Sequence, residues 1–257
     1  GPTSGMTKRV LFVCTHLLGD TIAATSVVRA YARSHPQEEI TLLVADEPFA
    51  PLFRWIPGLH RLARIKPPSR HDLVFTSPQE WMAGLPYLDG FDDVYFLDVQ
   101  EVAKRRWGSK TGHMSTGYAE LIGIELDDRR PVLDVNQARQ HRPLEAPDGP
   151  FVVLARHTVS GSLIGPESGL TKRWSEERWR TLATCIQRQL GMRVVSIGTP
   201  VEPRLHHAGV VELHDLEIVE LAGLLSQAAA LVTVDNGVFH LGQALGTPLV
   251  HLLPSWM

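Results

Sequence analysis

Hydrophobic residues in this chain come in short runs that are separated by longer amphipathic stretches. In residues 9–14, apolar side chains follow one another without alternation, a pattern typical of a strand covered on both faces in a parallel sheet. The first half predicts strands at 9–14, 40–44, 62–65, 72–75 and 94–97, and helices at 21–34, 47–55 and 115–123. This alternation indicates a doubly wound α/β domain.

The same alternation begins again after residue 150. It predicts strands at 151–155, 193–197, 210–213, 231–234 and 249–253, and helices at 176–190, 216–228 and 238–245. Between the two halves, residues 136–150 are polar and aperiodic and include Pro143, Pro147 and Pro150, which is typical of a linker. The sequence therefore predicts two α/β domains, 6–135 and 151–257, joined by a linker at 136–150.

Composition narrows the class of protein. A net charge of −3 with a pI of about 6.5 argues against a nucleic-acid binder, which usually carries a basic excess. No run approaches the ~20 apolar residues of a membrane helix, and no secretory signal follows the first basic residues. Cys14 and Cys185 belong to no metal-binding pattern, so we expect two reduced, buried thiols and no metal. We expect a cytoplasmic protein, and we expect residues 1–5 to be a cloning remnant.

Three segments follow predicted strands, where open α/β sheets bind their ligands. The first, residues 15–20, ends in Gly19 and Asp20. A carboxylate at this position can accept a proton from a hydroxyl group. Asp20 can also cap the helix predicted at 21–34, which contributes ~1 kcal/mol and is the more routine role. The two roles are compatible.

The second segment, residues 161–174, contains three glycines and ends in Lys172, Arg173 and Trp174. It matches neither a Walker loop nor the GxGxxG pattern. Lys172 can reach a diphosphate from such a loop. A surface loop with a solvated Lys-Arg pair is the interpretation that spacing alone favours.

The third segment is Asp235-Asn236-Gly237, which precedes the helix predicted at 238–245. The N–H groups and the dipole of a helix N-terminus favour an anion. Gly237 permits close approach of a phosphate, and His240 lies one turn further on. An ordinary N-cap at Asp235 or Asn236 explains the segment equally well.

Taken together, the three segments resemble the signature of glycosyltransferase family 9, the ADP-heptose:lipopolysaccharide heptosyltransferases. The family has a Leu-Gly-Asp turn after its first strand, matched by residues 18–20, and a Lys followed shortly by Trp, matched by Lys172 and Trp174. Its last motif is matched by Asp-Asn-Gly-Val-Phe-His-Leu at 235–241 and Ala-Leu-Gly-Thr-Pro at 244–248. The resemblance spans residues 9–253.

The resemblance implies a GT-B fold, in which two Rossmann-like domains with parallel sheets face a central cleft. It implies inverting transfer of a heptose from ADP-heptose, with no cofactor beyond this nucleotide sugar and no obligatory metal. The acceptor is expected to be a glycan, a glycolipid, a protein or a small molecule. Nucleic acid is not an expected partner, and membrane contact is expected to be peripheral at most, at the inner membrane.

The resemblance also assigns roles to individual residues. Asp20 is expected to be the general base, and the donor and acceptor residues follow as two sets. For the donor they are Lys172, Asp235, Asn236, Gly237 and His240, which are expected at the phosphates, and Glu202, which is expected at the ribose. For the acceptor they are His16, Gly19, Arg105 and Arg106; the two arginines fit an anionic acceptor, although a solvated basic turn explains them as well.

The chain departs from the family pattern in three ways. Asn236 stands where the family usually has Thr or Ser, and the loop at 161–169 is longer than expected. The chain ends at Met257, whereas family members usually continue for several tens of residues. From this we expect a second domain without the usual C-terminal tail.

Two other interpretations remain open. A sugar-nucleotide epimerase would use the same phosphate site without an acceptor. A non-catalytic member would bind a nucleotide sugar or a partner protein. An NAD-dependent dehydrogenase is disfavoured because GxGxxG is missing.

Overall fold

The computed structural model describes residues 7–106, 113–158 and 173–253, and the chain forms two compact units, Gly1–Asp134 and Val135–Met257. The first unit contains β1 (Arg9–Cys14), α1 (Leu18–Ser34), β2 (Glu39–Ala45), η1 (Ala50–Trp55), β3 (Arg61–Ile65), α2 (Arg70–Phe75), α3 (Pro78–Met82), η2 (Pro86–Gly90), β4 (Asp93–Phe96), α4 (Val99–Arg106) and α5 (Met114–Ile122). The second contains α6 (Val135–Arg139), β5 (Phe151–Ala155), α9 (Glu176–Gln189), β6 (Arg193–Ile197), β7 (Val210–Leu213), α10 (Ile218–Leu225), β8 (Ala230–Val234), α11 (Gly237–Leu245) and β9 (Leu249–Leu252).

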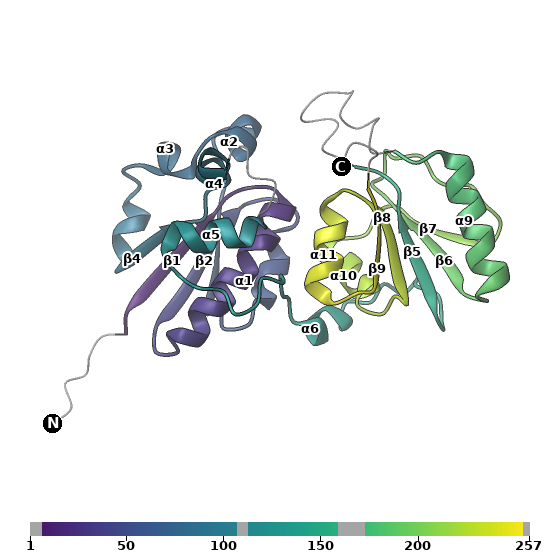
Figure 1. The fold of residues 1–257 in the computed structure, drawn as a ribbon, viewed down its shortest axis with the longest axis horizontal. Helices are drawn as coiled ribbons and strands as arrows, with labels where there is room; N and C mark the ends of the chain where they lie inside the picture. The colour runs from purple at the N-terminus through teal and green to yellow at the C-terminus, as the bar shows by residue number, and fades with distance from the viewer. Residues whose placement is uncertain (1–6, 107–112, 159–172, 254–257) are drawn as a thin grey trace. The chain divides into compact units, whose positions relative to one another are not determined.

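The first unit has a four-stranded parallel sheet in the order β3-β2-β1-β4 (Figure 1). Central strand β1 is buried from Val10 to Cys14, which explains its unbroken apolar run. Its alternate side chains face two different layers. Phe12 packs edge-on against Tyr31 of α1, while Leu11 belongs to a cluster on the opposite face.

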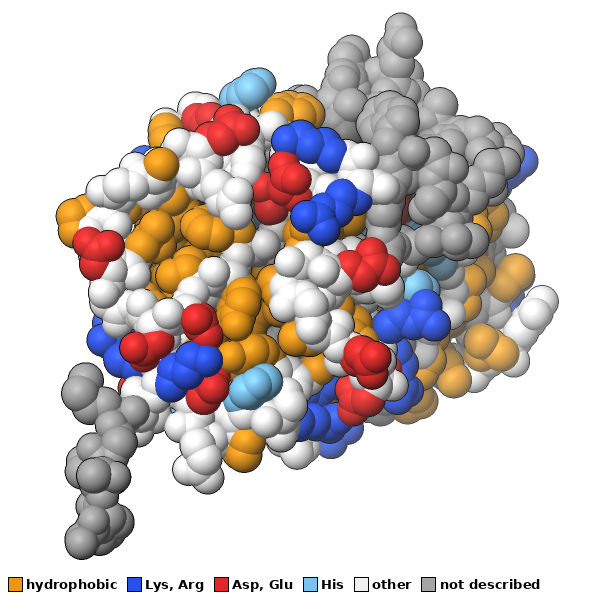
Figure 2. Space-filling model, turned by 60° about the vertical axis from the view of Figure 1, so that its left-hand side comes forward, with side chains coloured by type: hydrophobic (Ala, Val, Ile, Leu, Met, Phe, Trp, Pro, Cys, Tyr) orange, Lys and Arg blue, Asp and Glu red, His pale blue; other side chains and the backbone are white. Residues whose placement is uncertain are grey.

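That opposite face is covered by the short elements between β3 and β4. Leu11, Leu43 and Met82 form its buried centre, and Trp81 and Leu88 pack around them while remaining partly exposed. Figure 2 shows hydrophobic side chains on the visible face of this unit, with charged side chains around them. A thin layer of short helices thus leaves part of the apolar surface in contact with water.

The second unit has a five-stranded parallel sheet in the order β7-β6-β5-β8-β9, with α9 on one face and α10 and α11 on the other (Figure 1). Helix α11 ends at Gly246, whose φ of 71° is left-handed. Gly246 thus ends the helix predicted at 238–245, because glycine adopts that conformation without a steric penalty.

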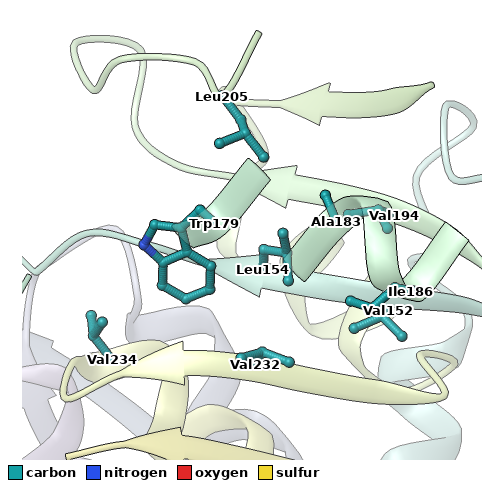
Figure 3. Packing of buried hydrophobic residues seen from close by; sticks show 9 residues of the cluster. All are labelled: Val152, Leu154, Trp179, Ala183, Ile186, Val194, Leu205, Val232 and Val234. Carbon is teal, nitrogen blue, oxygen red and sulfur yellow. The ribbon is translucent and has the colours of Figure 1, made fainter. Parts of the chain in front are cut away.

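The core of the second unit lies between α9 and the sheet (Figure 3). Fully buried Trp179 packs over Leu154 and Val234 in this cluster, and Trp174 meets its ring edge-on at 5.2 Å. Replacing such a tryptophan by alanine costs ~3–5 kcal/mol. Trp179 therefore contributes strongly to fixing α9 on the sheet.

Three predictions of local structure differ from the fold. The strand predicted at 72–75 is wrong, because this segment is the end of helix α2. Ser69 caps the N-terminus of that helix, and its hydroxyl oxygen accepts a hydrogen bond from the Asp72 N–H at 3.1 Å. The helix predicted at 47–55 is a 3₁₀ helix confined to Ala50–Trp55. Residues 136–150, interpreted from sequence as a linker, include most of α6 and fall within the second compact unit.

Among the described residues, no helix has the length and hydropathy needed to cross a bilayer. Cys14 and Cys185 are both free thiols. Cys14 is buried, which confirms the prediction for this thiol, whereas Cys185 is partly exposed and the prediction of burial is wrong there.

Candidate functional site

Each sheet has one point at which the strand order reverses direction: between β1 and β4 in the first unit, and between β5 and β8 in the second. Ligands of open α/β sheets bind beyond the carboxyl ends of the strands at such points. Asp20 and Asp98 follow β1 and β4, and His157 and Asn236 follow β5 and β8. Each unit therefore has polar side chains at the position where its topology favours a ligand.

Asp20 is the third residue of α1 and not its cap. The helix begins at Leu18, and the capping position is Leu17, whose carbonyl already accepts the Thr21 N–H at 3.0 Å. The predicted N-cap role of Asp20 is therefore wrong. Its carboxylate instead lies in the first helical turn, where the helix dipole favours a negative charge.

Burial outweighs the helix dipole at this carboxylate and raises the pKa of Asp20 to about 6. Within the described residues, the carboxylate makes no hydrogen bond or ion pair. Behind it lie Cys14 and Tyr118, both buried, and burial raises the pKa of the Cys14 thiol to about 12. Asp20 is thus a desolvated carboxylate that pairs with no residue in the described part of the chain, and its pKa suits proton transfer near neutral pH.

His16 lies in the loop between β1 and α1 and is only 1% exposed. Its Nε2 accepts the Val99 main-chain N–H at 3.2 Å and lies 3.9 Å from Asp98 Oδ1. Burial lowers the pKa of His16 despite the opposing effect of Asp98, in keeping with a neutral ring that accepts a hydrogen bond. These contacts join the loop after β1 to the loop after β4. Gly19, the other acceptor residue predicted here, is the second residue of α1 and is half-buried.

The basic residues proposed for the acceptor lie on α4. Arg105 is exposed and lines a cavity of about 250 Å³ together with Tyr95 and Asp98. Arg106 is the last residue of α4, and its side chain lies outside the described part of the structure. Arg105 is therefore placed on the same unit as Asp20, while its role stays a prediction.

In the second unit, Asn236 is the N-cap of α11, which confirms one of the two predicted caps. Its Oδ1 accepts the Phe239 N–H at 3.0 Å and lies 3.1 Å from the Thr233 hydroxyl. Its Nδ2 donates to the His157 carbonyl at 2.8 Å. Both ends of the side-chain amide are thus occupied in shaping the loop.

The first N–H groups of α11 lack intrahelical acceptors, and the Asn236 cap satisfies one of them, that of Phe239. No described residue accepts a hydrogen bond from the N–H groups of Gly237 and Val238, so both are donors that a ligand at this helix end can use. His240, one turn further on, is half-buried; burial lowers its pKa, Asp235 opposes this effect, and His251 adds to the lowering. This helix end can therefore receive a diphosphate.

Glu202 follows β6, the strand beside β5, where an acidic side chain commonly holds a ribose. Its Oε2 accepts the Thr199 N–H at 2.7 Å. Lys172 and the glycine-rich loop at 161–169 lie outside the described residues, so their predicted roles stay predictions.

Sequence reasoning missed three buried or half-buried polar residues at strand ends: Asp98 after β4, and Arg156 and His157 after β5. Burial, with a smaller contribution from Arg156, lowers the pKa of His157. The available signal was their position directly after apolar runs. In the described ranges 7–106, 113–158 and 173–253, no group of three His, Cys, Asp or Glu side chains is placed to bind a metal.

The model of glycosyltransferase family 9 (heptosyltransferase) matches residues 97–253, more than half of the chain. Lipopolysaccharide heptosyltransferase 1 of Pseudomonas aeruginosa is 26% identical over 286 residues, an alignment that covers 95% of this chain and 78% of that protein. Lipooligosaccharide heptosyltransferase 2 of Haemophilus influenzae is 29% identical over 136 residues, 48% of this chain but only 39% of the relative.

The fold also matches solved structures. E. coli heptosyltransferase WaaC with ADP-2-deoxy-2-fluoro heptose superposes with a TM-score of 0.68 at 20% identity, covering 95% of this chain and 88% of WaaC. The two units are therefore the Rossmann-like domains of a GT-B fold, as predicted. The chain belongs to glycosyltransferase family 9, the heptosyltransferases.

Proposed function

We propose that this chain is an inverting glycosyltransferase that moves a heptose from ADP-heptose to an acceptor hydroxyl without a metal. Family membership supports the reaction class. The WaaC structure with ADP-2-deoxy-2-fluoro heptose supports the donor. The two relatives, a lipooligosaccharide and a lipopolysaccharide heptosyltransferase, support an acceptor of the lipopolysaccharide type. We place the reaction in the cytoplasm, at the periphery of the inner membrane.

The observation that carries the proposal is the desolvated Asp20 carboxylate at the carboxyl end of β1, with a pKa of about 6. The acceptor hydroxyl gives its proton to this carboxylate. At the same time the hydroxyl oxygen attacks the anomeric carbon of the heptose from the side opposite the diphosphate. The bond between that carbon and the diphosphate oxygen breaks, and ADP leaves with the electron pair. Attack from the opposite side inverts the anomeric configuration.

Stabilising the departing diphosphate is the larger electrostatic task. The N-terminus of α11 supplies the N–H groups of Gly237 and Val238, and His240 adds a ring on the same helix. Asn236 acts by fixing the helix end, with Asp235 beside it. Lys172 supplies a cation.

The remaining roles concern the two substrates. Glu202 holds the ribose of the donor. On the acceptor side, Arg105 and Arg106 meet the anionic groups of a phosphorylated or acidic sugar lipid, and His16 and Gly19 shape the loop that presents Asp20.

The proposal is tested by calorimetric titration with ADP, ADP-heptose, UDP-glucose and GDP-mannose. We expect ADP and ADP-heptose to bind and Lys172→Ala to weaken both, while Lys66→Ala, a lysine of the first unit, leaves them unchanged. Asp20→Asn should bind ADP-heptose like the parent chain but turn over at least 100-fold more slowly. Unchanged turnover of Asp20→Asn at saturation would refute the base assignment, and an absence of nucleotide binding would favour a non-catalytic member.

A further inference from the structure

The turn between β6 and β7 is closed by the residue that we assign to the ribose. Glu202 donates its main-chain N–H to the Thr199 carbonyl at 3.1 Å, and its Oε2 accepts the Thr199 N–H at 2.7 Å. Its other oxygen, Oε1, makes no hydrogen bond within the described residues. One carboxylate oxygen is thus used by the turn, and the other is available to a ligand.

The buried side chain of Arg156 contacts this turn through a hydrogen bond to its main chain. The Arg156 side chain is completely buried at the end of β5, and its guanidinium makes three hydrogen bonds. They run to Glu176 Oε1 at 2.6 Å, Ser196 Oγ at 3.3 Å and the Pro203 carbonyl at 2.6 Å. Because the guanidinium is a rigid planar fork, these bonds fix the position of Pro203, the residue directly after Glu202.

Glu212 of β7 and His214, the residue directly after β7, contact both ends of the turn. Glu212 Oε1 accepts the main-chain N–H groups of Leu205 at 2.7 Å and of His206 at 3.2 Å. Its Oε2 lies 2.8 Å from His214 Nε2, and His214 Nδ1 lies 3.3 Å from the Thr199 carbonyl. Both ring nitrogens of His214 therefore face oxygen atoms, one on the Glu212 side chain and one on the Thr199 main chain.

Two further features show how tightly the turn is fixed. His206 has a φ of 50°, a left-handed conformation that is unfavourable for a residue other than glycine. At Gly198, a Cβ atom would lie 2.8 Å from Glu202 Oε2 and 2.9 Å from His214 Nδ1. The carboxylate and the imidazole thus pack against the same point of the backbone.

We propose that Arg156, Glu212 and His214 are positioning residues that aim the free oxygen of Glu202 at the ribose hydroxyls of the donor. Fixing the turn in advance removes the entropy cost of ordering Glu202 when the nucleotide binds. The network thereby sets the preference for a nucleoside diphosphate with an intact ribose. This inference rests on the ribose role of Glu202 in the proposed function.

The test compares the affinities of ADP and 2′,3′-dideoxy-ADP by calorimetry. We expect the parent chain to bind ADP about tenfold more tightly, because charged hydrogen bonds to the ribose hydroxyls are lost with the analogue. Arg156→Lys keeps the buried charge but cannot reproduce the fork, and Glu212→Gln removes the charge that faces His214. In both variants, ADP affinity should fall to that of the analogue, while the analogue binds as it does to the parent.

The matched control is Gln187→Ala. Gln187 of α9 donates to the carbonyl of Ala208 at 3.0 Å. Ala208 also lies between β6 and β7, but it follows the residues that contact Arg156, Glu212 and His214. Loss of the Gln187 side chain should therefore leave both affinities unchanged. A variant that weakens both nucleotides equally, or that keeps the tenfold preference, overturns the inference. If either positioning variant fails to fold, His214→Gln takes its place, with the same expectation and the same refuting outcomes.

Failure of the underlying ribose assignment gives a different pattern. If Glu202→Ala keeps the parent's preference for ADP, or if the parent shows no preference, Glu202 does not hold the ribose, and the inference falls with that assignment. If Glu202→Ala abolishes the preference and the positioning variants retain it, only the inference fails.

Discussion

The side-chain amide of Asn236 donates to the main-chain carbonyl of His157 over 2.8 Å and thereby joins the loop after β8 to the loop after β5. The two strands are neighbours at the point where the strand order of the second sheet reverses. A residue that lies in a family motif therefore also connects two loops of the candidate donor site.

This double role separates two substitutions of Asn236. Both Asn236→Ser and Asn236→Asp keep an oxygen that can cap α11 but lose the bond to His157, so each should lower the free energy of unfolding by about 1 kcal/mol. Only Asp adds a negative charge where the diphosphate is proposed to bind. We expect ADP affinity to fall at least tenfold in Asn236→Asp and to stay within a few-fold of the parent in Asn236→Ser. If both variants lose ADP affinity equally, the diphosphate does not bind beside Asn236.

Proton transfer to Asp20 predicts a pH profile. The carboxylate must be ionised to accept a proton, and burial raises its pKa to about 6. The rate constant kcat/KM should therefore fall about tenfold for each pH unit below pH 6 and level off above it. If kcat/KM instead falls only below about pH 4, where an ordinary aspartate titrates, Asp20 is not the titrating base.

The same burial predicts how Asp20 affects stability. In the unfolded chain this carboxyl has its ordinary pKa of 3.8, whereas burial raises its pKa in the folded chain to about 6. Folding thus carries a cost above pH 6 that shrinks as the pH falls and disappears below about pH 3, where the carboxyl is protonated in both states. After a discount for partial exposure, Asp20→Asn should be about 1–2 kcal/mol more stable than the parent at pH 8.

Urea unfolding at pH 8 and pH 4 measures this difference. Most of the stabilising effect of Asp20→Asn should be lost at pH 4, where the carboxyl of the folded parent is itself neutral. A gain of equal size at both pH values would instead reflect a change in packing, and the assignment of a buried charge to Asp20 would be wrong.

The contact between α4 and α5 predicts a coupled pair of substitutions. A Cβ atom at Gly117 would overlap the Val102 side chain. Gly117→Ala should therefore destabilise the chain by about 1–3 kcal/mol, although alanine favours a helix. In a Val102→Ala background the space is open, so the added methyl group should cost little. A double-mutant cycle measured by urea unfolding checks this, and strict additivity would contradict it.

The central strands were predictable because their signal is local. Apolar runs such as 9–14 and 151–155 are covered on both faces, so each residue of the run contributes to the pattern. The segment 72–75 was mispredicted because the apolar run 73–75 is too short to distinguish a strand from a helix, and the Ser69 cap favours the helix. Helix α6 has five residues, too few to show a period.

The site was predictable where a motif carried it and not where distant segments meet. Asn236 as a cap could be found from its neighbours. The bonds of Arg156 run to residues 20, 40 and 47 positions away, and no local pattern encodes such contacts. The raised pKa of Asp20 likewise depends on burial by the folded unit, which the residues beside it do not reveal.

Each sheet is built from one continuous stretch of chain, with the strands of the first between Arg9 and Phe96 and those of the second between Phe151 and Leu252. No strand pairing joins the two sheets within the described residues. A ribosome therefore delivers every strand of the first sheet before it begins the second, so the first unit can form its core while the rest is still being made. The first turn of α1, which carries Asp20, can thus be assembled before the loop of Asn236 has been synthesised.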